Sequence, residues 1–430
     1  MTEATSGSRY LEFKYGWKVV VASAVGIALG MSPLPFYTIG VFQISYTAEF
    51  GWSRGMVLLG LTVFTLCAVP LAPTIGNLAD RFGVRRVVLL AIPGLSIGLM
   101  AMALNNGSYP LYLTLWGLLA ILGIGTLPIT FTRAVNRWFH DCRGLALGCA
   151  LIGTGLAGWA AIKLVGWLIP LVGWRWAYVC LGAVPMLIAF PIVYFLFFDV
   201  DDERVQDKVA ALKRERSTPV TLMPGGLTLS EAFRDWRLWL LIYAFLPISF
   251  VIAGPIPGIV DIMMSKEFTR AEAITLGSIV PFAVFFGRLI GGYLIDKIWA
   301  PLVSMVILSL PMVFCYLLRL DDPGFYTIAL ANISLGFAAG VEYDLLAFLV
   351  SRYFGLKAYS SIYGVIYVVF ALGAGFAPGL YGFSADRFGD YDFILGIALL
   401  ATPLFTVPLL ALGRYREYPP EDDPPAIASQ

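Results

Sequence analysis

Charged residues are scarce in this 430-residue chain. Only 13% of its residues are charged and 59% are hydrophobic, whereas a soluble domain is roughly half apolar and a quarter charged. The formal net charge of +1 provides no concentrated positive field, which a nucleic-acid partner would require. The composition therefore predicts an integral membrane protein that lies in a lipid bilayer and does not bind nucleic acid.

Cysteine and histidine are also few, which excludes several kinds of chemistry. His140 is the only histidine, and no phosphate-binding Gly-Lys-Ser/Thr loop or nucleophile paired with a base is visible. We therefore expect no cofactor, no metal and no enzymatic activity. The five cysteines lack the short paired spacing of a zinc site or a disulfide framework, and they are Cys67, Cys142, Cys149, Cys180 and Cys315.

Long apolar runs are abundant instead. A membrane-spanning helix needs about 20 mostly apolar residues, and by that measure the chain contains roughly twelve. They form two sets of six, which predicts an all-α membrane protein with two six-helix halves. The predicted spans are 18–42, 54–77, 86–105, 111–135, 143–168, 175–198, 238–262, 271–293, 301–319, 325–352, 358–382 and 391–413.

One long polar stretch, residues 199–237, separates the two sets and is rich in Lys and Arg. We interpret it as a cytosolic linker between an N-terminal half (18–198) and a C-terminal half (238–413). Most of the 29 Lys and Arg lie in the loops on the linker's side, so the positive-inside rule places both terminal tails, 1–17 and 414–430, in the cytosol. We expect a multi-pass protein of the plasma membrane, or of the inner membrane if the source is bacterial.

A charged loop that contains glycine occurs twice between apolar runs. Its first copy, residues 76–86, reads GNLADRFGVRR, and its second copy, residues 292–297, reads GYLIDK. A second landmark agrees, because RWF at 137–139 returns as RYF at 352–354 with nearly the same offset. Recurrence at one offset indicates that the chain consists of two repeated halves.

The first copy of the loop resembles the signature of the major facilitator superfamily at Gly76, Asp80, Arg81, Gly83, Arg85 and Arg86. This resemblance covers essentially the whole chain, and it implies a substrate held between the halves near the middle of the membrane and released by alternating access. An acid and several bases at a helix end also predict a cytosolic gate that latches the halves together. We assign to this gate Gly76, Asp80, Arg81, Gly83, Arg137 and Asp296.

Five shorter motifs resemble the monocarboxylate transporter family and its bacterial relatives. They are YGW at 15–17, FGWSR at 50–54, RWF through RGLALG at 137–148, GWR at 173–175 and GLYGFSADRFGDY at 379–391. That family moves small carboxylates such as lactate and pyruvate, typically with a proton, and related branches exchange oxalate for formate. The resemblance implies a secondary transporter whose partners are a small organic anion and a proton.

Arg288 is the main candidate for binding the anion. It lies in the eighth predicted span, where a permanent guanidinium is costly unless it is paired or faces water. Its planar fork matches a carboxylate, and the family resemblance implies a substrate-binding arginine at this place. The alternative is a structural charge that extends to the cytosolic face. Tyr37 and Tyr367 are expected to line the same cavity and to offer hydroxyl groups to the substrate.

Glu342 and Asp344, in the tenth predicted span, are candidates for proton coupling, because carboxyl groups in a dry helix suit reversible proton carriage. They are two positions apart, so at most one faces the cavity directly. We prefer Glu342, with a static ion pair as the alternative. The family has an aspartate one turn before the arginine, but Val284 stands there in this chain, and a tenth-span acid would have to replace it.

Lys163 lies in the fifth predicted span, where the family usually has a proline. It either supplies a second positive charge to the anion or extends its ammonium group to the outer face. The first possibility fits an exchanger of organic anions in which Lys163 and Arg288 together hold a dicarboxylate. The sequence thus leaves three functional hypotheses: proton symport of monocarboxylates, exchange of organic anions, and a receptor that does not transport.

Overall fold

The computed structural model describes residues 11–139, 143–200, 202–207, 225–355, 357–416 and 418. These residues form helices, and the β-pairing among them is one isolated bridge between Gly226 and Gly355. Eleven helical stretches are long and apolar enough to cross a membrane. One of them, Leu145–Leu196, has 52 residues and bends at Gly173, where φ is 80°. It is too long for one crossing of a hydrocarbon core about 30 Å thick, so it supplies two spans. The predicted all-α membrane fold is confirmed.

The first group of helices begins at Leu11, inside the predicted N-terminal tail. Its first membrane span consists of two helical pieces and ends at Phe50. Its first span is broken by residues 29–32, and Pro33 starts the second piece, where the fixed φ of proline suits a first helical turn. The elements are α2 (Leu11–Ala28), α3 (Pro33–Phe50), α4 (Arg54–Phe82), α5 (Val84–Ala101), α6 (Tyr109–Gly123), α7 (Pro128–Trp138), α8 (Arg143–Leu151), α9 (Gly153–Val184) and α10 (Phe190–Leu196).

The second group of helices begins with a short helix, α12, whose N-terminus has a capping box. Hydrogen bonds from the backbone and the hydroxyl of Thr228 hold the pKa of Glu231 below its usual value. Residues 208–224 of the predicted linker lie outside the described part of the chain. The elements are α12 (Leu229–Arg234), α13 (Trp236–Ala253), α14 (Ile259–Met264), α15 (Arg270–Lys297), α16 (Ala300–Leu308), α17 (Pro311–Leu318), α18 (Phe325–Phe354), α19 (Tyr359–Phe388) and α20 (Asp392–Thr406).

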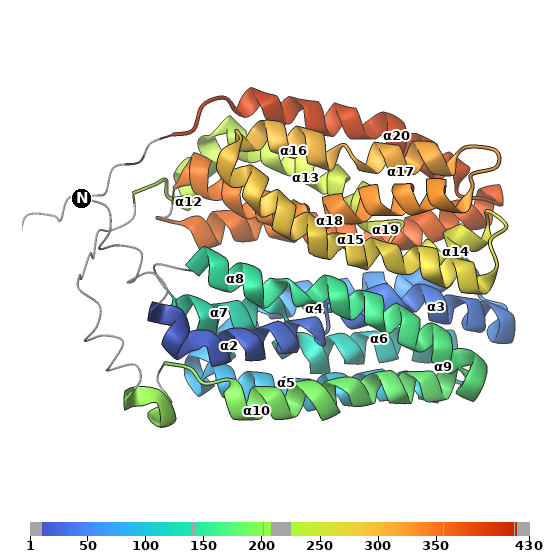
Figure 1. Cartoon of the computed structure of the whole chain (residues 1–430), viewed down its shortest axis with the longest axis horizontal. Helices are drawn as coiled ribbons and strands as arrows, with labels where there is room; N and C mark the ends of the chain where they lie inside the picture. The colour runs from blue at the N-terminus through green and yellow to red at the C-terminus, as the bar shows by residue number, and fades with distance from the viewer. Residues whose placement is uncertain are drawn as a thin grey trace, which may run out of the picture.

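The two groups lie side by side with their helices running in the same general direction (Figure 1). We call the described residues up to Asp207, which include α2–α10, the first half, and the described residues from Gly225 on, which include α12–α20, the second half. Between them, α4 packs on α19 and α9 packs on α15. Glycines permit these crossings, since a Cβ on Gly155 would lie 2.5 Å from the carbonyl oxygen of Pro281, and one on Gly382 would lie 2.7 Å from the nitrogen of Gly55. Small residues at such crossings let membrane helices approach closely.

The bundle has two distinct ends (Figure 1). The terminal end carries the first and last described residues, Leu11 and Tyr418. The far end carries the turn between α3 and α4, the bend of α9 at Gly173 and the turn between α19 and α20. Because α15 begins at the far end and finishes at the terminal end, the depth of any residue on it follows from its position in the helix.

Candidate functional site

Arg288 joins the two halves inside the bundle. It lies on α15, nine residues before the helix ends at Lys297. Its Nη1 donates a hydrogen bond of 2.7 Å to the carbonyl oxygen of Leu151, the last residue of α8, one position before the break at Ile152 between α8 and α9. A helix end leaves carbonyl groups without intrahelical partners, which explains why this carbonyl can accept a bond from the opposite half.

One edge of the Arg288 guanidinium is left without a partner among the described residues. Its Nε is buried and has no hydrogen-bond partner among the described residues. A guanidinium has five N–H donors in a rigid fork, and the bond from Nη1 occupies only one of its sides. The edge that contains Nε therefore has the geometry to bind both oxygens of a carboxylate.

Side chains from three other helices lie within electrostatic reach of Arg288. Tyr37 comes from α3 of the first half, Tyr343 and Asp344 come from α18, and Tyr363 comes from α19. All five side chains are half-buried although each lies well inside a long helical span. The structure thus brings together one cation, one acid and several hydroxyl groups at the boundary between the halves.

The two predicted tyrosines belong to this cluster. Tyr37 packs against α9, because a Cβ on Gly158 would lie 2.5 Å from its ring. Tyr367 follows Tyr363 by one turn of α19, with ring centroids 5.9 Å apart. The ring of Tyr343 lies 6.2 Å from that of Tyr367. Tyr37 thus interacts directly with Arg288, whereas Tyr367 is connected to it through Tyr343 and Tyr363.

The structure separates the two acids of α18. Asp344 is half-buried and interacts electrostatically with Arg288 and Tyr363. Glu342 is only 2% exposed, and its Oε1 has no hydrogen-bond partner among the described residues. Two positions on an α-helix differ by about 200°, so Glu342 turns away from Arg288. The spacing of the two acids correctly implies that they diverge. The preference for Glu342 as the acid that faces the cavity does not agree with this geometry, because Asp344 is the one that lies near Arg288.

Lys163 and Arg288 are not brought together. The Nζ of Lys163 donates a hydrogen bond of 2.9 Å to the hydroxyl of Thr275, which lies in the first part of α15, near the far end. Thr275 precedes Arg288 by thirteen positions, or about 20 Å along a helix that rises 1.5 Å per residue. A small dicarboxylate cannot reach both cations at once in this arrangement.

The predicted gate residues lie at the terminal end. Gly83 ends α4 with φ 85°, a value that favours glycine, and Arg81 is exposed. Arg137 forms an ion pair of 2.8 Å with Asp199, which belongs to the same half. The remaining predicted gate side chains, as well as His140, lie outside the described residues: Gly76, Asp80 and Asp296.

A network at the far end connects the halves, and sequence reasoning missed it. The Nε of Arg54 contacts Oδ2 of Asp261 at 2.6 Å, and the hydroxyl of Tyr391 donates to the same oxygen at 2.7 Å. Asp386 accepts from the backbone nitrogens of Arg54 and Gly55, at 3.1 and 2.8 Å. The carboxylate of Asp386 therefore caps α4 from the opposite half. The only sequence signal was the presence of Arg54, Asp386 and Tyr391 within the family motifs.

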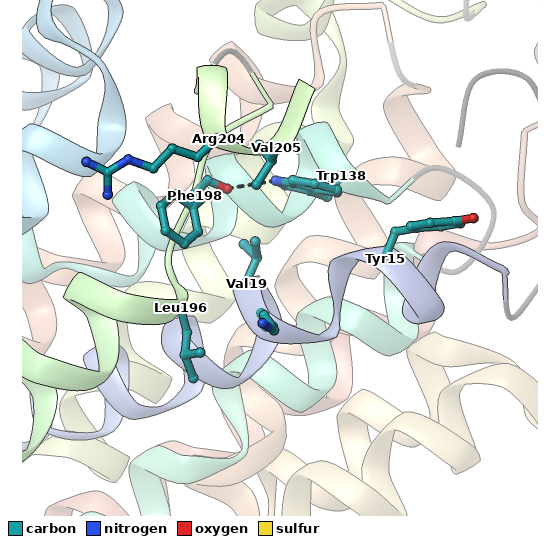
Figure 2. Close-up of a pocket in the computed structure, with 8 residues that line it drawn as sticks. Tyr15, Val19, Trp138, Leu196, Phe198, Arg204 and Val205 are labelled. Carbon is teal, nitrogen blue, oxygen red and sulfur yellow. Dashed lines mark hydrogen bonds between the residues drawn. The ribbon is translucent and has the colours of Figure 1, made fainter. Parts of the chain in front are cut away.

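A separate pocket lies at the terminal end of the first half (Figure 2). Across it, Trp138 donates from Nε1 to the carbonyl oxygen of Phe198 at 2.9 Å, drawn as the dashed line in Figure 2. None of the predicted substrate-binding residues lines this pocket, so we place the candidate site at Arg288. The pocket is lined by Tyr15, Lys18, Val19, Trp138, Leu196, Phe198, Arg204 and Val205.

Comparisons with known proteins agree with this architecture. Residues 25–378 match the family model described as Major Facilitator Superfamily. The chain is 26% identical to the cis,cis-muconate transport protein of Acinetobacter baylyi over 86% of this chain and 88% of that protein. It is 24% identical to monocarboxylate transporter 11 of Mus musculus, over 88% and 83% of the two chains. A bacterial homolog of the human lysosomal transporter Spinster, crystallised in an inward-facing and occupied conformation, matches with a TM-score of 0.65 at 18% identity, over 93% of this chain and 96% of that chain.

Proposed function

Because the chain belongs to the Major Facilitator Superfamily and is a multi-pass membrane transporter, we propose that it carries small organic anions, in the first place monocarboxylates of the lactate and pyruvate kind. One observation carries this proposal. A guanidinium with a buried, unpartnered edge lies between the halves, near hydroxyl groups from both. The names of two relatives, a muconate transport protein and a monocarboxylate transporter, support a carboxylate substrate.

Binding uses groups from both halves. The substrate carboxylate occupies the Nε edge of Arg288 while Nη1 keeps its bond to the carbonyl of Leu151. Tyr37 approaches the guanidinium from the first half. On the second half, Tyr367 lies beside Tyr363 and lines the same site. A ligand that touches both halves can then bias which of their two arrangements is populated.

Proton coupling follows from the charge balance near Arg288. Without a bound anion, Asp344 is the acid within electrostatic reach of the guanidinium, so its carboxylate can balance that charge. When a second anion binds, two negative charges would share one cation in a poorly solvated place, so a proton on Asp344 makes the loaded site neutral. Glu342, the other proposed proton carrier, is buried on the opposite face of α18. Replacing each acid by its amide, Asp344→Asn and Glu342→Gln, separates their roles through the pH dependence of uptake.

Alternating access requires that the ends of the bundle open in turn. We place the terminal end in the cytosol, in the plasma membrane or a bacterial inner membrane, with both termini inside. The far-end network supports a structure whose outer side is closed. The proposed cytosolic gate latches the halves in the opposite state, and its residues are Gly76, Asp80, Arg81, Gly83, Arg137 and Asp296.

The test of the anion site is uptake of labelled lactate and pyruvate into vesicles that contain the purified protein. Arg288→Ala should reduce uptake at least about 100-fold, because two charge-assisted hydrogen bonds are lost. Arg288→Lys should also fail, since an ammonium group cannot reproduce the planar fork. Arg319→Lys is the matched control, because Arg319 is exposed at the far end of the second half. Wild-type uptake by a folded Arg288→Ala protein would exclude the proposal.

The driving force distinguishes the remaining alternatives. Uptake into empty vesicles that is driven by an imposed proton gradient supports symport and excludes obligate exchange. Uptake that requires a carboxylate inside the vesicle supports the exchanger. Substrate binding without any flux in either format would favour a receptor.

A further inference from the structure

A ladder of aromatic rings runs along one side of α19. Tyr359, Tyr363 and Tyr367 are spaced by one helical turn, and Phe370 follows them. Successive ring centroids are 5.8, 5.9 and 6.2 Å apart, with interplanar angles of 20°, 19° and 22°. Tyr343 of α18 lies against the deep end of this ladder, 4.8 Å from the ring of Phe370. We call Tyr343, Tyr363, Tyr367 and Phe370 the ring wall.

The ring wall lies beside Arg288 and not on the lipid-facing surface. Arg288 interacts electrostatically with Tyr343 and Tyr363, two members from different helices. Tyr343, Tyr363 and Tyr367 are each half-buried. By contrast, Tyr243 of α13 is 44% exposed and contacts the ring of Phe405 on α20, as expected for an aromatic residue on the bundle surface.

The polar tips of the ring wall are unused. The hydroxyl groups of Tyr343, Tyr363 and Tyr367 form no hydrogen bond with another described residue. The three residues are half-buried, and their hydroxyl oxygens are not among the buried side-chain atoms without a partner, so a ligand can reach them. Accessible hydroxyls on this wall, two of them on residues that interact with Arg288, therefore point to a ligand that brings its own oxygen atoms.

Resting on the proposed function, we infer that the substrate is a planar, conjugated or aromatic carboxylate, whose carboxylate binds Arg288 and whose flat π-system lies against the ring wall. Aromatic faces and edges favour a flat unsaturated partner over a puckered saturated one of equal size, because the attraction between ring quadrupoles adds to burial. A two-carbon or three-carbon acid would reach Arg288 but would leave Tyr367 and Phe370 uncovered.

Two probes of equal carbon number test the inference: benzoate, which is flat, and cyclohexanecarboxylate, which is puckered. Binding to the purified full chain is measured by calorimetry, with lactate as a third probe. We expect benzoate to bind about tenfold more tightly than cyclohexanecarboxylate. Tyr367→Leu should reduce this preference to about threefold or less, while Tyr367→Phe should keep it, because the ring remains. Tyr243→Leu is the control and should leave the preference unchanged.

The outcomes separate this inference from the proposed function. Lactate binding that depends on Arg288, with no preference for benzoate over cyclohexanecarboxylate, overturns the inference and leaves the proposed function intact. Equal preference in Tyr367→Leu and in the wild-type protein also overturns it. If no carboxylate binds, or if binding survives Arg288→Ala, the proposed anion site itself is wrong.

Discussion

The two ends of the bundle are held by different kinds of contact. At the far end, Asp261 and Asp386 of the second half bind Arg54 of the first half, at its side chain and at its backbone nitrogen. At the terminal end, the ion pairs between described residues stay within one half. Arg137 pairs with Asp199 in the first half, and Arg416 pairs with Asp235 in the second.

Among the described residues, separating the halves at the terminal end would break none of these ion pairs. Separating the halves at the far end would expose an ion pair and remove the cap of α4, and each of these changes carries a cost. The terminal-end pairs would survive a separation there. We therefore expect the far-end network to contribute most to holding this conformation, beside the single hydrogen bonds that also join the halves. Four substitutions test that expectation, from the largest expected effect to the smallest.

Asp261→Asn should have the largest effect. It removes the charge that binds both Arg54 and Tyr391, and it should shift the ratio of far-end-open to far-end-closed molecules about 5- to 150-fold, the usual range for 1–3 kcal/mol of coupling. Distances between spin labels at positions 104 and 322, both exposed at the far end, report the shift in a cysteine-free background. An unchanged distance distribution would mean that the network does not hold the halves together.

Asp386→Ala should have the second largest effect. It removes a carboxylate that accepts from the nitrogens of Arg54 and Gly55, and loss of a helix cap typically costs about 0.5–2 kcal/mol. The same label pair should show an increase of roughly 2- to 30-fold in the open population. Asp390→Ala is a suitable control, because Asp390 is exposed nearby and its carboxylate accepts a hydrogen bond from the backbone nitrogen of Asp392 in the same half.

Arg81→Ala should act in the opposite direction and more weakly. Arg81 is exposed in the present conformation, so it contributes little here, but the proposed gate needs it when the terminal end closes. We expect a shift of about two- to fivefold toward the present conformation, in line with one partly exposed ion pair. Labels at the terminal end measure it, and a shift toward the far-end-open state would remove Arg81 from the gate.

Arg416→Ala should have the smallest effect. The pair with Asp235 lies within the second half, and Arg416 is 40% exposed, so its loss should cost about 0–1 kcal/mol of stability. The distance distributions at both ends should match those of the unmodified protein. A clear change at the far end would show that pairs within one half also set the conformation, and the contrast between the ends would no longer hold.

Two of the family motifs show what the sequence could and could not predict. The FGWSR motif at 50–54 and the motif at 379–391 were recognised separately, yet the structure joins them through Arg54, Asp386 and Tyr391. Their backbone contact links positions 332 residues apart. A sequence motif is recognised from neighbouring residues. The sequence therefore revealed the two motifs but not the network of contacts between them.

The sequence by itself determined the features that depend on local composition. Apolar length and loop charge were enough for the all-α membrane fold, and a lone arginine inside an apolar span was enough to select Arg288. Tertiary packing decided how each helix is rotated about its axis. It also decided which residues of the two halves lie at the same depth in the membrane. It turned Asp344 toward Arg288 and Glu342 away, and it placed Lys163 beside Thr275 instead. The physical reason is that hydropathy acts residue by residue, whereas rotation and register follow from contacts between helices that are distant in the chain.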